Sequence, residues 1–297
     1  MMRYDVVGLG TASHDLIGVA DMEPLLGRKQ PVAQWIESGG GPVPTALVVL
    51  ARLGARTCMV GAVGDDAYGA RIIADLAAEG VDTAGMQVRP GGSHVAFVLA
   101  EPGSDRRSVW FRTDPAVLAA VHVERDLITA GRALHLDTYT GEAGLQAARW
   151  AREAGIPVMI DAERVRAYTM ELLPLCTWLV VSANFGRAVT GEADPEAAAI
   201  ALRARYDAMI VVTAGERGSW CATGDECFHT SAFPTQPLDT TGCGDVFHGG
   251  LLFALLRGDP PRQALRLASA VAALKTRAYG GRAGIPTLEA VEAWMRA

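Results

Sequence analysis

The sequence Asp239-Thr240-Thr241-Gly242-Cys243-Gly244-Asp245 precedes an apolar helical run, 246–256, and says more about this chain than any other stretch. Two glycines within three residues allow a sharp turn that gathers backbone N–H groups at a helix start. Unpaired N–H groups and the helix dipole favour a negative charge there, so the loop predicts an anion-binding site. Asp245 lies at the N-cap or in the first turn. A carboxylate at that place can cap the helix or act as a general base toward a hydroxyl.

The composition indicates a sizeable core and no preference for polyanions. With 297 residues and 50% hydrophobic content, the chain is long enough for one large domain or two. A formal net charge of -6 and the lack of basic runs argue against nucleic acid or an anionic membrane as a partner. No window approaches the roughly 18 apolar residues of a membrane span, and the start lacks a signal-peptide pattern. The 5 cysteines are scattered without a C-x-x-C pair, so we expect no disulfide framework, no zinc site and a cytoplasmic protein.

Short β-rich runs alternate with helical runs along the chain, which predicts an α/β fold with a largely parallel sheet. No linker or repeat interrupts this rhythm, so we expect a single domain, 1–297. The expected buried strands are 4–10, 57–63, 133–137, 157–161, 178–182 and 208–213. The expected helices are 45–53, 67–79, 144–154, 195–206, 245–256, 261–277 and 287–296. Three further runs, 32–37, 95–100 and 108–112, alternate like strands of an exposed sheet.

The seven-residue loop resembles the D-T-x-G-x-G-D signature of the ribokinase-like (pfkB) carbohydrate kinases. This resemblance implies a doubly wound, mostly parallel sheet with a small β-sheet lid. It also implies that the amides of Gly242, Cys243 and Gly244 form the anion hole and that Asp245 is the catalytic base. The activity that follows is transfer of the γ-phosphoryl group of ATP, with Mg²⁺, to a hydroxyl of a small carbohydrate.

The amino-terminal half carries the motifs that the resemblance connects with sugar binding. Asp15 follows the first strand, and its carboxylate can accept hydrogen bonds from vicinal hydroxyls or act as an ordinary turn residue. Gly39, Gly40 and Gly41 precede a helix start, so they form either a close approach of backbone to ligand or a flexible turn. In the family such glycines lie under the sugar. Pro44 stands where the family commonly has Asn, so one usual sugar contact is missing.

The lid is placed by the same resemblance around 12–37 and 92–114. Within it, Arg112 and Lys29 are either solvated charges or contacts to an anionic substituent of the sugar. Exposed lid strands can pair between subunits, which makes a homodimer through the lid one expectation.

The carboxyl-terminal half carries a nucleotide motif. The stretch 211–218 ends a buried strand and matches the family's V-T-x-G-x-x-G turn, with a plain strand exit as the alternative. The resemblance places Thr213, Gly215 and Gly218 beside the ATP phosphates and the sugar, and Ser269 against the base.

The family's N-x-x-E motif, which organises magnesium, is not kept. Anchoring on Thr190-Gly191 puts Ser182 and Phe185 at its positions, whereas Asn184 preserves an Asn only in a shifted register. Asn184 is therefore a weak candidate for a nucleotide contact, and we expect Mg²⁺ to be bound largely by ATP and water.

A monovalent-cation (potassium) site is a further expectation. Asp239, the Thr241 carbonyl and the carbonyls of 276–284 resemble the site that lies next to the anion hole in many relatives. Oxygen ligands suit a hard cation, but Asp239 capping the loop explains the sequence equally well.

Several stretches look like the sulfofructose kinase branch, among them 39–46, 244–249 and 280–286. That likeness implies a ketohexose-like substrate, although the sulfonate-binding residues are not obviously repeated. A nucleoside kinase of the same fold, or a non-catalytic sensor of sugar and nucleotide, fits the same motifs. An oxidoreductase reading of 8–13 is weak because Ser13 replaces the third glycine of a dinucleotide turn.

Overall fold

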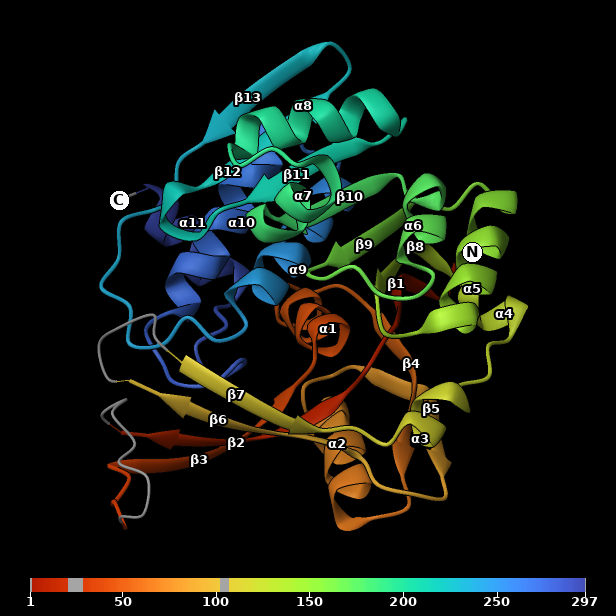
Figure 1. Ribbon diagram of the computed structural model, residues 1–297, viewed down its shortest axis with the longest axis vertical. Helices are drawn as coiled ribbons and strands as arrows, with labels where there is room; N and C mark the ends of the chain where they lie inside the picture. The colour runs from red at the N-terminus through yellow and green to blue at the C-terminus, as the bar shows by residue number, and fades with distance from the viewer. Residues whose placement is uncertain (1, 21–28, 102–106, 297) are drawn as a thin grey trace.

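The computed structural model describes residues 2–20, 29–101 and 107–296, and it contains two β-sheets (Figure 1). The strands of the main sheet are β1 (Tyr4–Leu9), β4 (Thr57–Gly64), β5 (Asp82–Arg89), β8 (Gly131–Asp137), β9 (Val158–Ala162), β10 (Trp178–Ser182), β11 (Met209–Thr213), β12 (Ser219–Thr223) and β13 (Glu226–Thr230). Their spatial order is β13-β12-β11-β10-β9-β8-β1-β4-β5. All neighbouring pairs from β11 to β5 are parallel, whereas β12 and β13 form an antiparallel edge. The predicted mostly parallel sheet is confirmed.

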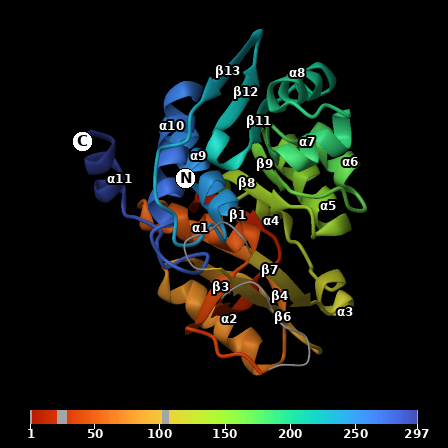
Figure 2. The ribbon, with the colours of Figure 1, turned by 60° about the vertical axis from the view of Figure 1, so that its left-hand side comes forward.

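Helices cover both faces of this sheet. They are α1 (Pro42–Arg52), α2 (Ala67–Ala78), α3 (Pro115–Ala119), α4 (Arg125–Ile128), α5 (Gly141–Glu153), α6 (Thr169–Leu172), η1 (Leu173–Leu175), α7 (Ala183–Thr190), α8 (Pro195–Arg205), η2 (Gly215–Arg217), α9 (Cys243–Arg257), α10 (Pro261–Lys275) and α11 (Leu288–Arg296). Figure 2 shows α10 and α11 on one side of the sheet and α7 and α8 on the other. Among the described residues, none of these helices has both the length and the apolar character to cross a bilayer.

The core is double because the parallel strands are buried on both faces. Along β11, Val211 packs into one hydrophobic cluster, while Ile210 and Val212 pack into the other. Side chains of a strand alternate between faces, so an uninterrupted apolar run is what a strand covered twice requires. Cys58 and Cys221 are buried in these same clusters, and none of the five cysteines forms a disulfide.

The second sheet is the small lid. Its strands are β2 (Ser13–Val19), β3 (Gln34–Gly40), β6 (His94–Ala100) and β7 (Arg107–Arg112), in the order β3-β2-β6-β7. Figure 1 shows these four strands together, to one side of the main sheet. A separate lid sheet is therefore confirmed, although β3 runs on to Gly40, beyond the expected limit at residue 37. Residues 21–28 and 102–106 of the expected lid lie outside the described residues.

Several helices and strands were not predicted from the sequence. The segment 13–19 lies in the part of the chain that the resemblance assigned to the lid, but it was not among the runs read as strands; it forms β2 because it pairs with β3 on one side and β6 on the other. Its Asp15 and Gly18 have low strand propensity, and tertiary pairing outweighs that preference. The short helix α7 and the edge hairpin of β12 and β13 were not predicted either.

Candidate active site

The carboxyl ends of the parallel strands gather the polar residues of the molecule. Asp137 ends β8, Asp161 stands directly beside it on β9, and Thr213 ends β11. In open parallel sheets, ligands bind outside this edge. The sequence analysis had not singled out Asp137 or Asp161, although each is an acidic residue at the end of an apolar strand.

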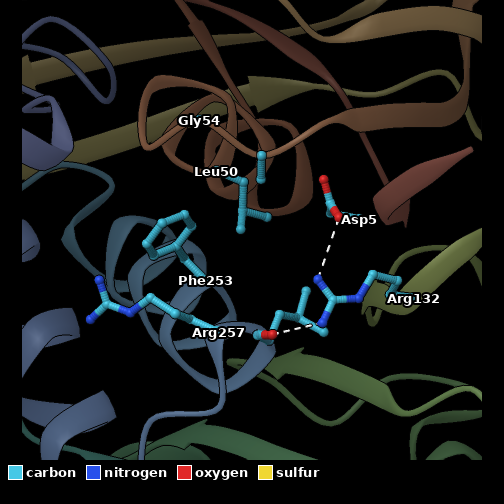
Figure 3. A pocket seen from close by; sticks show the side chains of 8 residues that line it. Asp5, Leu50, Gly54, Arg132, Phe253 and Arg257 are labelled. Carbon is cyan, nitrogen blue, oxygen red and sulfur yellow. Dashed lines mark hydrogen bonds and ion pairs between the residues drawn. The ribbon is translucent and has the colours of Figure 1, made fainter.

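A hollow also exists at the opposite edge of the sheet (Figure 3). It has a volume of about 200 Å³, and its wall includes Asp5 and Arg132, near the amino ends of β1 and β8. Arg132 donates to the Leu256 carbonyl at 2.7 Å and approaches the Asp5 carboxylate at 3.5 Å. These contacts bind neighbouring elements to one another. We place the candidate site at the carboxyl edge instead.

The loop before α9 is held in shape by Asp239. One oxygen of its carboxylate accepts hydrogen bonds from the amide and hydroxyl of Thr241, at 2.8 and 2.7 Å. The other accepts from the amide of Gly280 at 2.7 Å, which ties the loop to the segment after α10. Gly242 then adopts a left-handed conformation, with φ of 74°, as the N-cap of α9. A Cβ there would be both strained and crowded by Gly281, so glycine is required.

The amides at this helix start are only partly free. The N–H of Cys243 donates to the Thr240 carbonyl at 3.2 Å, so it is engaged within the loop. In the part of the chain that the structure describes, the N–H groups of Gly242, Gly244 and Asp245 have no acceptor. Three open donors at the start of a 15-residue helix form the anion-binding arrangement that the sequence predicts. The expected contribution of the Cys243 amide must be corrected, because an internal bond occupies it.

Asp245 lies half-buried in the first turn of α9, and its carboxylate has no hydrogen-bond partner among the described residues. Burial raises its pKa above the ordinary 3.8, and the nearby Asp161 carboxylate raises the pKa further. The pKa of Asp161 is itself raised by burial and by the adjacent Asp137. A carboxylate with a raised pKa and no fixed partner is suited to accept a proton from a bound hydroxyl.

His248, one turn beyond Asp245, supports this region from beneath. Its Nδ1 lies 2.7 Å from the Gly244 carbonyl and 3.4 Å from the Asp161 carboxylate, and its Nε2 lies 3.1 Å from the Val180 carbonyl. Burial lowers the pKa of this imidazole. Both ring nitrogens therefore face protein oxygens, so His248 connects α9 to the sheet and does not face a ligand.

The glycine-rich side of the site is assembled by strand pairing. β2 and β3 place His14 opposite Gly39 and Asp15 opposite Ser38. The carboxylate of Asp15 is buried, accepts a hydrogen bond from Ser13 at 2.7 Å, and has its pKa raised by that burial. A Cβ on Gly40 would lie 2.2 Å from an oxygen of this carboxylate. Close approach of Asp15 therefore requires glycine at position 40, whereas the sequence predicts a close approach of backbone to ligand or a flexible turn for this stretch.

Arg282 is a buried cation that the sequence analysis did not assign to the site. Its Nη2 donates to the Gly40 carbonyl at 2.9 Å, and its Nε lies 3.4 Å from the Thr45 hydroxyl. A Cβ on Gly39 would fall 2.1 Å from its guanidinium. Burial lowers its pKa to about 10, while Asp15 and Asp245 oppose that change through their charges. Asp15 belongs to the glycine-rich side of the site and Asp245 to the anion-binding loop. Both carboxylates act on one arginine, so these two halves of the site adjoin.

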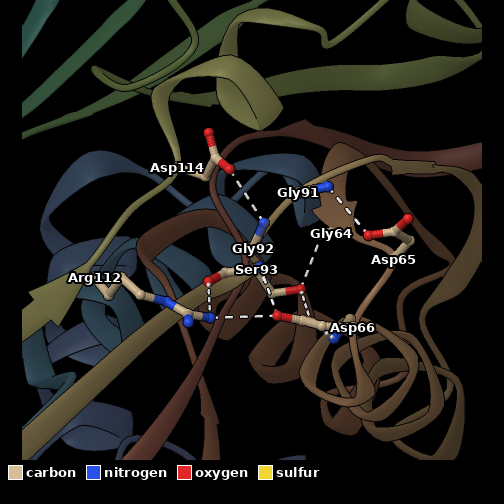
Figure 4. A network of polar contacts seen from close by, with 9 residues as sticks. Gly64, Asp65, Asp66, Gly91, Gly92, Ser93, Arg112 and Asp114 are labelled. Carbon is tan, nitrogen blue, oxygen red and sulfur yellow. Dashed lines mark hydrogen bonds and ion pairs between the residues drawn. The ribbon is translucent and has the colours of Figure 1, made fainter.

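Arg112 does not lie with these residues (Figure 4). Its guanidinium donates to the Asp66 carboxylate at 3.3 Å and to the Ser93 carbonyl at 3.4 Å. Asp66 also caps α2 by accepting from Gly69, and it accepts from the Ser93 hydroxyl at 2.6 Å. Figure 4 shows Arg112 pointing toward Asp66 and Ser93. These contacts connect the lid to the start of α2, and a role of Arg112 in substrate binding stays a prediction.

A cavity of about 530 Å³ opens beside the anion-binding loop. A volume in this range is typical of small-molecule sites. Phe233 and Phe247 contribute apolar side chains to its wall. The site residues expected from the sequence that line it are Thr213, Gly215, Gly218, Cys243, Gly244 and Ser269. The structure thus brings the predicted nucleotide turn and the predicted anion hole to one cavity.

Asn184 is not part of this arrangement. It is exposed on α7 and does not line the 530 Å³ cavity. Ser182 instead caps α7 by accepting from the Phe185 amide at 3.2 Å, and the Phe185 ring is buried. The expected nucleotide contact of Asn184 is therefore not supported. Within the described ranges, no group of three or more His, Cys, Asp or Glu side chains is arranged to hold a metal ion.

The expected potassium ligands are also engaged. The ammonium of Lys275 donates to the backbone carbonyl of Asp239 at 3.1 Å and to that of Thr241. Both oxygens of the Asp239 carboxylate already accept protein hydrogen bonds. The oxygen atoms that would bind a monovalent metal ion therefore do not fit one in this chain.

Comparison with known proteins agrees with this geometry. The model of the pfkB family carbohydrate kinases matches residues 4–288. The chain is 29% identical to ribokinase of Bacillus subtilis, over 96% of this chain and 97% of that one, and 27% identical to a nucleoside kinase of Methanothermobacter thermautotrophicus, over 97% and 94%. A solved ribokinase-like protein of Agrobacterium tumefaciens gives a TM-score of 0.93 at 31% identity, covering 98% and 97%. Arabidopsis thaliana ribokinase, solved with ribose and ATP, shares the fold at a TM-score of 0.84 and 21% identity, covering 100% of both chains. The resemblance read from the loop is confirmed, and the chain belongs to the pfkB family of carbohydrate kinases.

Proposed function

We propose that this protein transfers the γ-phosphoryl group of ATP to a hydroxyl of a small sugar. The observation that carries the proposal is the position of Asp245. Its carboxylate has a raised pKa and no partner in the described chain, and it follows directly on the open amides of Gly242 and Gly244. Gly244 lines the 530 Å³ cavity, and the buried Asp15 acts electrostatically on Asp245. A base between an anion-binding loop and a buried carboxylate suits phosphoryl transfer to an alcohol.

In the proposed mechanism, the nucleotide occupies the cavity bordered by Thr213, Gly215, Gly218 and Ser269. Asp15 accepts hydrogen bonds from sugar hydroxyls. Asp245 takes the proton of the attacking sugar hydroxyl. The oxygen of that hydroxyl forms a bond to the γ-phosphorus, while the bond between the γ-phosphorus and the bridging oxygen breaks and ADP leaves. The open amides of Gly242 and Gly244 stabilise the charge on the transferring group. Mg²⁺, bound through the phosphates of ATP and water, supplies charge neutralisation.

The sugar is proposed to be ketohexose-like, as the likeness of 39–46 and 280–286 to one branch implies. The buried guanidinium of Arg282 donates to the Gly40 carbonyl and so fixes the backbone on this side of the site. A nucleoside kinase is the second candidate, because the Methanothermobacter relative carries that name. An ADP-release screen with ketoses, aldoses, sugar phosphates and nucleosides separates the two.

Asp245→Asn tests the mechanism, because it keeps the size of the side chain and removes the base. We expect kcat to fall by roughly 10²- to 10⁴-fold, with nucleotide binding retained and thermal stability unchanged or raised, because the variant lacks a charge that burial disfavours. Asp207→Asn is the control, since the side chain of Asp207 is fully exposed in a surface ion pair. A variant at 245 that kept most of its turnover would remove the assignment of the base. Sugar and ATP binding by the wild type without ADP release would instead favour a sensor.

We further propose that a second copy of the chain pairs through the lid. Trp35 and Trp110 are 53% and 54% exposed, and both contact the ring of Phe97. Phe97 pairs with Leu16, so this aromatic face is opposite the face that carries Asp15. Exposed aromatic clusters of this kind are typical of interfaces. Light scattering after gel filtration should show a dimer that Trp110→Glu converts to a monomer, and a monomeric wild type would contradict the proposal.

A further inference from the structure

Lys275 is a buried cation whose hydrogen-bond acceptors, among the described residues, are backbone oxygens. It ends α10, its exposure is 0%, and its Nζ donates to the carbonyls of Asp239 and Thr241. No carboxylate in the described ranges lies within 4.0 Å of this nitrogen. An ammonium buried away from water is costly unless it is well coordinated. The two carbonyl oxygens that converge on this buried charge are of the kind that a hard monovalent ion takes as ligands.

The position of these carbonyls connects Lys275 to the anion-binding loop. The carbonyl of Thr241 and the N–H of Gly242 belong to one peptide group. Lys275 holds the oxygen of that group, while its N–H has no acceptor in the described chain. A cation on the carbonyl polarises the peptide and strengthens its N–H as a donor. The fixed charge behind the loop therefore favours an anion in front of it.

We propose that the ammonium of Lys275 takes the place of a monovalent metal ion and makes this kinase independent of potassium. Lys275 acts as a positioning residue: it fixes the carbonyls of Asp239 and Thr241 and supplies one permanent positive charge to the loop. The kinetic test of this inference rests on the proposed kinase function. The thermal-unfolding test does not, because it measures cation binding at the loop itself.

The first measurement is the response of the wild type to cations. Initial rates in KCl, NaCl and choline chloride at equal ionic strength should agree within about twofold, because the site carries its own cation. Lys275→Ala removes the charge and opens a space lined by the two carbonyls. Its rate in choline chloride should fall by about tenfold or more, chiefly through kcat, and KCl, ammonium or methylammonium should restore part of the loss.

Two variants isolate the charge from the fold. Lys275→Met keeps most of the volume without the charge, so its activity should fall and no added cation should restore it. Arg296→Ala is the matched control, because it removes a positive charge whose side chain is 71% exposed at the end of α11. It should leave both the rate and the cation response unchanged.

Thermal unfolding gives the readout that does not depend on turnover. The Tm of Lys275→Ala should rise in KCl relative to choline chloride, whereas the Tm of the wild type should not respond to the choice of cation. If no sugar or nucleoside is phosphorylated at all, the proposed function fails, and this Tm difference still decides the inference. Activation of the wild type by potassium of more than about fivefold would overturn the inference, even if neither variant folds. A Lys275→Ala protein whose Tm and rate ignore potassium would overturn it as well.

Discussion

The anion-binding loop and the proposed sugar-binding side of the candidate site (the sugar side) adjoin, but they are built in different ways. In the loop, Asp239 accepts hydrogen bonds from Thr241 two residues later, and the left-handed Gly242 follows immediately. On the sugar side, Asp15 comes from β2, Gly40 from β3 and Arg282 from the segment after α10. A local motif carries its geometry in consecutive residues, whereas the sugar side exists only once distant segments pack together. The first can be read from the sequence, and the second requires the structure.

The largest expected effect comes from removing the residue that joins the sugar side. Arg282→Met keeps an unbranched apolar stem but leaves the buried Asp15 without the cation that opposes its raised pKa. Losing the hydrogen bonds of a buried charged group of this kind lowers the free energy of unfolding by about 1.5–3 kcal/mol. We also expect KM for the sugar to rise more than KM for ATP. Chemical denaturation and steady-state kinetics measure the two effects.

Two controls sharpen the result for Arg282. Arg296→Met removes an arginine whose side chain is 71% exposed and should change stability by less than about 1 kcal/mol. The double variant Arg282→Met, Asp15→Asn removes both buried charges and should recover part of the lost stability. Additive losses in the double variant would show that Asp15 and Arg282 are not coupled, and the two halves of the site would then be as independent as their sequences suggest.

Six strands of the main sheet, β11, β10, β9, β8, β1 and β4, were predictable because they are buried on both faces, whereas β5 at one edge and the antiparallel β12 and β13 at the other were not predicted. Runs such as 208–213 and 178–182 are apolar at nearly every position, and β11 and β10 match them within one residue. β2 was missed because two neighbouring strands, and not its own composition, keep Ser13–Val19 extended. Elements whose burial is continuous along the chain are visible in the sequence, while elements stabilised by their neighbours are not.

An intermediate effect is expected on the pH dependence of kcat/KM, through the pKa of Asp245 beside the anion-binding loop. Asp161 raises the pKa of Asp245 because two carboxylates close together disfavour a second negative charge. Asp161→Asn should lower the pKa of Asp245, so the acidic limb of kcat/KM should move to lower pH. The limb follows ionisation of the base, and a lower pKa leaves more base ionised at a given acidic pH. Profiles of kcat/KM from pH 5 to 9 measure this shift, with Asp207→Asn as the control.

The same groups affect stability with a definite sign. Because the folded pKa values of Asp161 and Asp245 lie above the ordinary 3.8, the folded state holds their protons more tightly than the unfolded state. Stability from these groups is present below about pH 4 and is lost as pH rises toward the raised pKa. Asp161→Asn should lose less stability over that range than the wild type. An acidic limb that stays in place, together with an unchanged stability profile, would show that Asp161 does not act on Asp245.

The site was predictable where one motif holds several of its residues. Gly242, Gly244 and Asp245 were assigned together, and Thr213 lines the same cavity as Gly244. Arg282 and Lys275 were not assigned, because a cation in a glycine-rich segment or at a helix end usually lies in solvent. Their burial depends on contacts with Gly40 and Thr241, which come from elsewhere in the chain. Charged residues that the local sequence would place in solvent thus become part of a site through tertiary packing, which no local pattern predicts.

The smallest expected effect concerns Arg112, which the motif-based reading placed with the sugar. Its side chain is 62% exposed, and its partner Asp66 is also held by Ser93 and Gly69. Arg112→Ala should therefore lower the free energy of unfolding by about 0–1 kcal/mol and leave KM for the sugar within about twofold. Matched measurements on Arg282→Met give the contrast. If Arg112→Ala raised KM for the sugar tenfold while stability stayed constant, the lid arginine would reach the substrate during turnover. The sugar side would then include Arg112 of β7 in addition to Asp15, Gly40 and Arg282.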